Sequence, residues 1–265
     1  MANLQILHSI DVIRKQYPTG EEPVLVMCSD MNYYICKYVH TSASAQKLAC
    51  ELIGVKMANA WQLDAPKASL VRIKSEHWPS HFIRPKIITS LLGSRFLENV
   101  IDVSPSTFDK VAQTSTVFVQ LLKIALFDFW IANEDRNANN ANLLYDISGS
   151  CLIPIDFGCI LNTADFDSPL MQLTFTDTIL WSPLFKYIIK GISQKRIKKD
   201  TAELREKYYG YIHESSLQMD SIIEDLPHEW NVSTDVIKNK LCQLFHPNWT
   251  EAVWNNFIDC LNGNI

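Results

Sequence analysis

The chain has 265 residues, of which 47% are hydrophobic and 20% charged, a composition that allows a sizeable core and excludes disordered, collagen-like and coiled-coil chains. A formal net charge of -5 disfavours nucleic acid as a direct partner. The 7 cysteines are scattered and form no Cys-x-x-Cys pair, so we expect neither a disulfide framework nor a structural zinc site, but a protein of the reducing cytoplasm.

The sequence contains no segment that we expect to span a membrane or to direct secretion. The N-terminus carries charges too early, and too short an apolar run, for a signal peptide. The longest apolar stretch, residues 117–132, includes Lys123 and Asp128 and is too short to cross a bilayer, so it is predicted to be a buried helix. The basic run at residues 195–199 is interpreted as a solvated helix end.

The first third of the chain is rich in short apolar runs that alternate with turn residues, which is typical of strands. Helix-forming residues at helical spacing follow the N-cap candidates of residues 41–44. The expected elements, in order, are an amphipathic helix over 5–16, a hairpin of strands 23–28 and 32–39 with its turn at 29–32, a helix over 45–60, and strands over 70–73 and 86–92, the last broken by Gly93.

Beyond Gly93 the predicted elements are mainly helical. The strongest helix covers 105–132, with Ser104 or Ser106 as its cap. The polar loop 133–142, a hairpin of 143–145 with 151–155, and helices over 233–246 and 249–261 follow it. Strands first and helices afterwards indicate an α+β protein with segregated elements. We place the boundary near Gly93, between a unit of residues 1–93 and a unit of residues 94–265.

The polar loop and the strand after it carry the clearest chemical signal. Asp135 precedes Asn140 by five residues, and Asp156 ends an apolar strand just before Phe157 and Gly158. A hydroxyl that attacks a γ-phosphate needs a carboxylate to accept its proton, which is the role expected for Asp135. Mg²⁺ on ATP prefers oxygen ligands, and Asp156 with Asn140 could supply them.

Two other amides in the loop, Asn139 and Asn142, are alternative ligands. A surface loop that is rich in Asn and Asp because these residues favour turns is the competing interpretation. Two features of the flanking sequence favour a catalytic and metal-binding role for this loop over a simple turn. The loop directly follows a long buried helix, and an acid after the apolar run 153–155 is costly unless a cation or other charge compensates it.

The stretch from Asp135 to Leu144, Asp-Arg-Asn-Ala-Asn-Asn-Ala-Asn-Leu-Leu, together with Ile155-Asp-Phe-Gly158, resembles the catalytic and metal-binding segments of HipA-like kinases. The same layout occurs in phosphoinositide-kinase-like enzymes. The run Leu226-Pro-His-Glu-Trp230 also resembles the C-terminal part of compact HipA-like proteins. The resemblance implies a two-lobed, protein-kinase-like fold with a small β-rich N-lobe and a mainly helical C-lobe, in which residues 133–144 form the catalytic loop.

This resemblance also implies where the nucleotide contacts lie. Lys37, in a strand of the N-lobe, would meet the α- and β-phosphates, and Glu51, the only acid of the helix 45–60, would pair with it. The adenine would lie against the connector near Leu91, Leu92 and Gly93. The alternatives are an exposed strand position for Lys37 and a solvated helix face for Glu51.

Some features depart from the kinase pattern. No Gly-x-Gly-x-x-Gly covers the phosphates; the turn 29–32 is expected in that place without a glycine, and its Asp30 would repel phosphate. Arg136 follows the catalytic acid instead of preceding it, and Asn137 stands where the lipid-kinase-like pattern has His. No Ala-Pro-Glu ends the activation segment, residues 159–175.

The sequence therefore predicts an ATP- and Mg²⁺-dependent phosphotransferase, by resemblance a serine/threonine protein kinase. Its partners would be a protein substrate and, if it is a toxin of a toxin–antitoxin system, an antitoxin or other regulatory protein. Two alternatives stand. One is a kinase of the same fold that acts on a lipid or a small alcohol, although the activation segment contains acids and no Lys or Arg. The other is a catalytically inactive binding or regulatory module, which the glycine-free turn would favour.

Overall fold

The structure is a computed structural model, and it describes residues 4–19, 21–82 and 90–264. Its strands are β1 Ile6–His8, β2 Lys15–Gln16, β3 Val24–Met27, β4 Tyr33–Lys37, β5 Ala68–Arg72, β6 Leu91–Arg95, β7 Val100–Asp102, β8 Leu143–Asp146 and β9 Cys151–Pro154. Its helices are α1 Ser42–Ala60, α2 Ser115–Ile131, α3 Ile160–Ala164, α4 Pro183–Ile189, α5 Gln194–Glu224, α6 Thr234–Leu244 and α7 Pro247–Asn262. Short 3-10 turns occur at Ser75–His77, Phe108–Lys110, Phe175–Asp177, Ile179–Trp181 and His228–Trp230.

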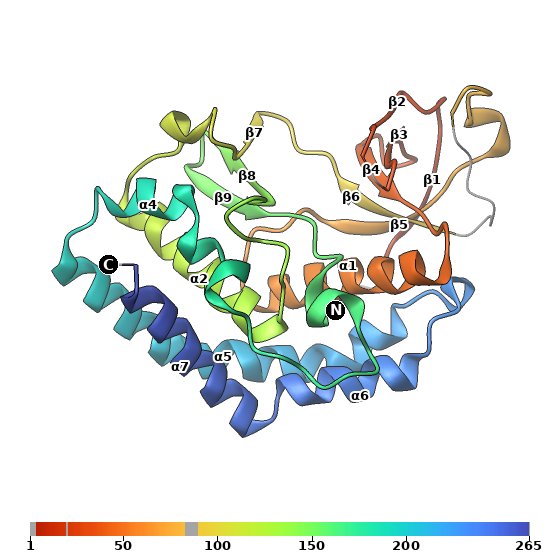
Figure 1. Cartoon of the computed structure of the whole chain (residues 1–265). Coiled ribbons are helices and arrows are strands. Elements are labelled where there is room, and N and C mark those ends of the chain that lie inside the picture. The colour runs from red at the N-terminus through yellow and green to blue at the C-terminus, as the bar shows by residue number, and fades with distance from the viewer. Residues whose placement is uncertain (1–3, 20, 83–89, 265) are drawn as a thin grey trace.

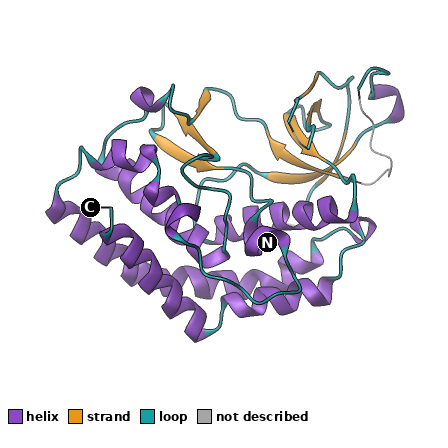
Figure 2. Cartoon of the chain, viewed as in Figure 1, coloured by secondary structure: helices purple, strands orange, loops and turns teal. Residues whose placement is uncertain are grey.

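Strands gather on one side of the molecule and helices on the other (Figures 1 and 2). Among the described residues, six strands form one sheet in the order β1-β5-β6-β4-β3-β2, in which β1 runs parallel to β5 and the other neighbours are antiparallel. Strands β7, β8 and β9 form a second, antiparallel sheet. The prediction of an α+β protein with segregated elements is confirmed.

Both faces of the six-stranded sheet pack against a hydrophobic core. Successive side chains of a strand point to opposite faces, so neighbouring residues belong to different cores. Leu92 belongs to the large core cluster that contains α1, whereas Leu91 belongs to a smaller cluster on the other face. Gly93 lies within β6 and does not end it; a Cβ there would lie 2.7 Å from Cγ2 of Val71. The strand therefore needs a glycine at this point so that it can lie close to β5, and the expectation that Gly93 breaks a strand was wrong.

The helical side is built around α2. Residues 117–118, 121–122 and 124–131 of this helix are all buried, which explains why its sequence is apolar on nearly every face. In Figure 1, α1 lies between the six-stranded sheet and helices α5 and α6. Helix α2 lies beneath the second sheet and alongside α7, and contacts between α2 and both β9 and α7 agree with this view.

Most of the predicted helices are confirmed, with shifted ends. Helix α1 begins after Thr41, which forms a capping box with Ser44. Helix α2 begins ten residues later than expected, since Thr114 caps it instead of Ser104 or Ser106. The hairpin of β8 and β9 and the helices α6 and α7 are found where they were expected. None of the described helices is long and apolar enough to cross a membrane.

The helix expected over residues 5–16 is wrong. The segment instead forms β1, which pairs with β5, and β2, which pairs with β3. The local helical pattern of this segment is weak, and hydrogen bonding to strands that are distant in the sequence decides its structure instead. The strand expected over 86–92 falls largely outside the described residues, and the structure describes this region from residue 90, with β6 starting at Leu91. The predicted boundary at residue 93 thus lies within β6.

Candidate active site

A cavity of about 670 Å³ opens between the six-stranded sheet, α1 and the hairpin of β8 and β9. This volume is in the range of small-molecule and cofactor sites. Its lining residues are Tyr17, Thr19, Glu21, Pro23, Ile35, Lys37, Glu51, Val55, Pro66, Ser94, Arg95, Phe96, Leu97, Val100, Asp102, Leu144, Ile155, Asp156 and Phe157.

Lys37 lines this cavity and contacts two acids in it. Alternation along β4 directs Ile35 and Lys37 into the cavity, while Tyr34 and Cys36 are buried in the opposite core. The Lys37 Nζ donates hydrogen bonds to Glu51 Oε2 at 3.1 Å and to Asp156 Oδ1 at 2.9 Å. One lysine therefore joins two acids that lie 14 and 119 residues away in the sequence.

The protonation states of Lys37, Glu51 and Asp156 depend on one another. Burial raises the pKa of Glu51 to about 7, against the lowering effect of Lys37. Burial acts to lower the pKa of Lys37, but Glu51, Asp156 and Glu21 together raise it well above its ordinary value. Burial likewise acts to raise the pKa of Asp156, which the Lys37 ammonium nevertheless holds below its ordinary value. Lys37 is therefore charged, and Asp156 is ionised beside it.

Close packing of α1 fixes Asp156 relative to Glu51. Gly54, on the next turn of α1, faces the ring of Phe157, and a Cβ at Gly54 would lie 2.3 Å from the Phe157 Cβ. Only glycine allows this approach. Asp156 itself has a φ of 58°, a left-handed conformation that Asp and Asn tolerate better than most residues. The helix and the Asp156-Phe157 segment therefore act as one rigid support for Lys37.

The second polar group of the site is the loop of residues 133–144, which begins after α2; we keep for it the name catalytic loop from the sequence prediction. Asp135 Oδ2 accepts hydrogen bonds from the side-chain Nδ2 atoms of Asn140, at 3.0 Å, and of Asn142, at 2.9 Å. Both donors use the same carboxylate oxygen, which orients Oδ1 of Asp135 away from them. A carboxylate held in this way can accept a proton through its second oxygen.

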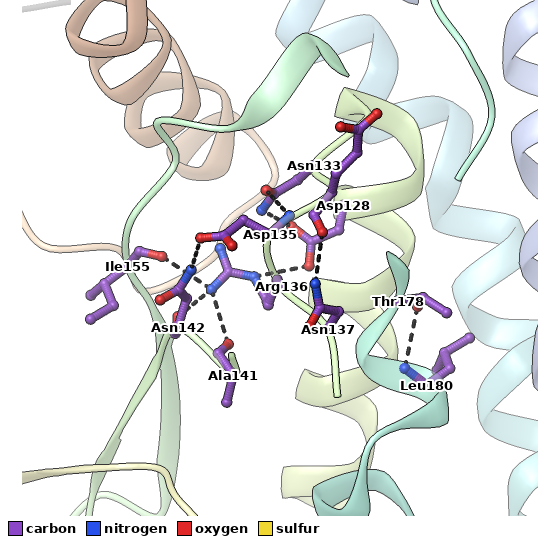
Figure 3. A network of polar contacts seen from close by, with 11 residues as sticks. Asp128, Asn133, Asp135, Arg136, Asn137, Ala141, Asn142, Ile155, Thr178 and Leu180 are labelled. Atoms are coloured by element: carbon purple, nitrogen blue, oxygen red, sulfur yellow. Dashed lines mark hydrogen bonds and ion pairs between the residues drawn. The ribbon is translucent and has the colours of Figure 1, made fainter. Parts of the chain in front are cut away.

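Beneath the catalytic loop lies a buried ion pair (Figure 3). Arg136 Nε donates to Asp128 Oδ2 at 2.9 Å, and their side chains are 0% and 1% exposed. Arg136 Nη1 also donates to the carbonyl oxygens of Asn142 and, at 3.1 Å, of Ile155. Asn133 Nδ2 donates to the other Asp128 oxygen at 2.8 Å. Burial raises the pKa of Asp128 to about 6, while Arg136 and Asn133 act to lower it.

Asn142 links the two polar groups of the site. Its side chain donates to Asp135, and its carbonyl accepts the backbone N–H of Ile155 at 3.0 Å. Ile155 directly precedes Asp156, whose carboxylate contacts Lys37. A short path of hydrogen bonds and one peptide bond thus connects Asp135 with the acid in the cavity. The structure brings Asn140 to Asp135 and Asp156 to Lys37.

The segment after Gly158 has an unusual backbone. Leu161, Asn162, Thr163 and Ala164 all have φ values between 57° and 60°, a left-handed turn without glycine. The buried Asn162 side chain holds this turn: its Oδ1 accepts the Met171 N–H at 2.8 Å, and its Nδ2 donates to Glu134 Oε1 at 2.8 Å. Strain that surrounding contacts maintain in this way is frequent at functional sites.

Comparison with known proteins identifies the family. The family model of the HipA-like kinases matches residues 10–252, which is most of the chain. The chain belongs to the HipA-like kinase family. The predicted resemblance to this family is thereby confirmed. Membership supports a phosphotransferase of the kinase type, which in general uses ATP.

Other comparisons add little. No curated protein matches this HipA-like kinase. Among solved structures, it is similar to the open conformation of CtTel1, with 14% identity and a TM-score of 0.40 over 94% of this chain and 12% of that one. It is also similar to the FAT and kinase domain of CtTel1, with 14% identity and a TM-score of 0.39 over 94% of this chain and 22% of that one. The chain thus spans less than a quarter of these proteins, and we draw no conclusion from matches of this level.

Asp156 of this HipA-like kinase fits a magnesium ion on a nucleotide, whereas Asn140 is not among the residues that line the cavity. Among the described residues, no group of three or more His, Cys, Asp and Glu side chains forms a metal site. Magnesium on a nucleotide needs only one or two protein ligands, because phosphate and water oxygens complete its shell. Asp156 offers an ionised carboxylate that lines the cavity and is 43% exposed. Asn140 commits its amide nitrogen to Asp135, and not its oxygen.

Two positional expectations require correction. Leu91, Leu92 and Gly93 lie inside β6, where the two leucines are 3% and 1% exposed and fill opposite cores, so they do not form the connector between the two sides of the molecule. Residues 94–97, directly after them, line the cavity instead. Any adenine contact on this side would therefore involve Ser94, Arg95, Phe96 or Leu97.

The turn at residues 29–32 is not among the cavity-lining residues; the loop between β2 and β3, residues 17–23, lies there instead, although residue 20 is outside the described part. Asp30 turns inward to accept hydrogen bonds from Asn32 and Tyr34, and so it does not face the cavity. Asp102 of β7 and, in this loop, Glu21 do line the cavity, and neither was predicted from the sequence. Recognising β2 as a strand would have indicated this loop.

Proposed function

We propose that this HipA-like kinase is an ATP-dependent phosphotransferase with the two-lobed arrangement of protein kinases. The six-stranded sheet and α1 would form the small lobe, and the helices with the β7–β9 sheet the large one. One observation carries the proposal: Lys37, in a cavity of about 670 Å³, contacts Glu51 at 3.1 Å and Asp156 at 2.9 Å. This is the arrangement that the chemistry of phosphoryl transfer requires of a lysine, its helix partner and a metal-binding acid.

In this proposal each residue has a separate task. Lys37 would bind the α- and β-phosphates, and Glu51 would hold its ammonium group in place. Asp135 would orient the acceptor hydroxyl and take its proton at Oδ1, since Oδ2 is committed to Asn140 and Asn142. Magnesium, when bound with the nucleotide through Asp156 and Asn140, would neutralise the charge of the phosphates.

We infer that the acceptor is a serine or threonine of a protein. Family membership supports this inference, as does the activation segment, residues 159–175, which contains Asp165 and Asp167 and no Lys or Arg. An acidic segment repels an anionic lipid head group and suits a polypeptide. An antitoxin or regulatory partner and a cytoplasmic location are proposals that rest on family membership alone.

Labelling with [γ-³²P]ATP and Mg²⁺ in a cell lysate tests the proposal. We expect protein-bound label that acid hydrolysis releases as phosphoserine or phosphothreonine. Asp135→Asn and Asp156→Asn should lose transfer while keeping the circular dichroism spectrum of the wild type. A matched control is Asp109→Asn, which removes one exposed acid away from Lys37, Asp135 and the activation segment. Label in the lipid extract would refute the protein acceptor, and full activity of Asp156→Asn would refute the site.

A further inference from the structure

Lys37 has a third acidic partner that the proposed function does not use. Glu21 Oε2 lies 3.2 Å from Lys37 Nζ, beside the contacts of the same nitrogen with Glu51 and Asp156. An ammonium group has three N–H donors. Two of these donors are used by Glu51 and Asp156, and the Glu21 carboxylate lies where a phosphate oxygen would approach the same nitrogen.

The three acids differ in how easily they could leave Lys37. The side chain of Glu51 is 5% exposed and could not be solvated elsewhere without moving α1. Asp156 is as exposed as Glu21, at 43%, but its side chain is short and its segment packs against α1. Glu21 is 40% exposed, has a longer side chain, and belongs to the loop 17–23 at the edge of the cavity. A phosphate oxygen would therefore displace Glu21 most easily.

Glu21 also opposes phosphate binding by its charge. A carboxylate in contact with Lys37 lies within a few ångströms of any phosphate oxygen that contacts the same nitrogen, and like charges at this distance repel even in water. We propose that Glu21 competes with the phosphate chain of the nucleotide for Lys37 and thereby sets the affinity of the cavity for polyphosphates. This proposal rests on the proposed nucleotide site, and it assigns a specificity-determining role to Glu21.

The test is calorimetric titration of the wild type, Glu21→Gln and Glu22→Gln with three probes: ATP, inorganic tripolyphosphate and adenosine, all with Mg²⁺. Glutamine keeps the shape of Glu21 and removes only its charge. Glu22→Gln removes the same charge one residue away and is the matched control. Glu21→Gln should bind ATP and tripolyphosphate at least about fivefold more tightly, the factor expected for one such repulsion in water. Its affinity for adenosine should not change.

The possible outcomes separate this inference from the proposed function. Equal ATP affinities of the wild type and Glu21→Gln would overturn the competition while leaving the nucleotide site intact. An equal gain for adenosine would also overturn it, because Glu21 would then shape the cavity as a whole. An equal gain in Glu22→Gln would show an effect of net charge and refute the assignment. Failure of every variant to bind ATP would refute the proposed function itself. ATP binding by Glu21→Gln alone would support both.

Discussion

Removal of the Arg136 side chain should destabilise the fold more than any surface charge substitution. The Arg136 and Asp128 side chains are 0% and 1% exposed and 2.9 Å apart. Arg136→Met keeps much of the volume but leaves Asp128 buried without its cation and the Ile155 carbonyl without this donor. Breaking a buried pair by removing one partner costs about 3–5 kcal/mol, a large part of the 5–15 kcal/mol that stabilises a typical protein.

Urea denaturation followed by tryptophan fluorescence measures this loss. The control is Lys199→Met, which breaks an ion pair with Glu203 whose side chains are 64% and 49% exposed. This substitution should cost about 0–0.5 kcal/mol. In the double variant Asp128→Asn/Arg136→Met the buried charge is absent, and so the double variant should be more stable than Arg136→Met alone.

The pH dependence of the Arg136→Met effect has a definite sign. Arg136 acts to lower the pKa of Asp128, which burial has already raised to about 6. Without Arg136 that pKa rises further, so the folded variant takes up a proton that the unfolded chain does not hold at the same pH. The loss should be largest near pH 8 and shrink towards pH 5. A loss below about 1 kcal/mol at pH 8, or a double variant no more stable than the single one, would refute the reasoning.

Three further substitutions test the geometry of the site. Gly54→Ala should displace Phe157, since the new Cβ would lie 2.3 Å from the Phe157 Cβ. Overpacking of this kind costs about 1–3 kcal/mol of stability. Both the melting temperature and the rate of ATP turnover should therefore fall. In a pH–rate profile of the wild type, ATP turnover should fall as the pH drops through about 7, because Glu51 then takes up a proton and loses its charge. The profile of Glu51→Gln should lack this fall. Asn162→Ala removes the acceptor of the Met171 N–H and should speed its amide hydrogen exchange without changing that of α2.

Local chemistry made part of the site predictable from the sequence. The spacing of Asp135 and Asn140 follows the path of one short loop, and the structure shows a hydrogen bond between these two side chains. The family resemblance implied Lys37 and Glu51, which lie in a predicted strand and a predicted helix, and the structure places their side chains 3.1 Å apart. In each case the sequence distance is small, or the element that presents the residue is regular.

The remaining features depend on contacts between distant parts of the chain. The composition of residues 5–16 is compatible with a helix as well as with strands. Only their pairing with β5 and β3 makes them strands. Because β2 was not expected, the loop over the cavity was assigned to residues 29–32 instead of 17–23, and Glu21 was missed. The partners of Asp128 could not be inferred either, since a helix pattern does not indicate which buried acid meets an arginine of the following loop.

The structure shows what Arg136, one departure from the kinase pattern, does in this protein. Arg136, which follows the proposed catalytic acid Asp135, points back into the core, where it binds Asp128 and the carbonyl oxygens of residues 142 and 155. The same arginine lies over the Phe157 ring, 5.2 Å from its centroid, and Phe157 also packs closely against Gly54 of α1. Arg136 therefore connects the catalytic loop, through Phe157, to the helix that carries Glu51. A change at Arg136 should disturb both polar groups of the site together, whereas a change at Glu21 should affect only the one that contains Lys37.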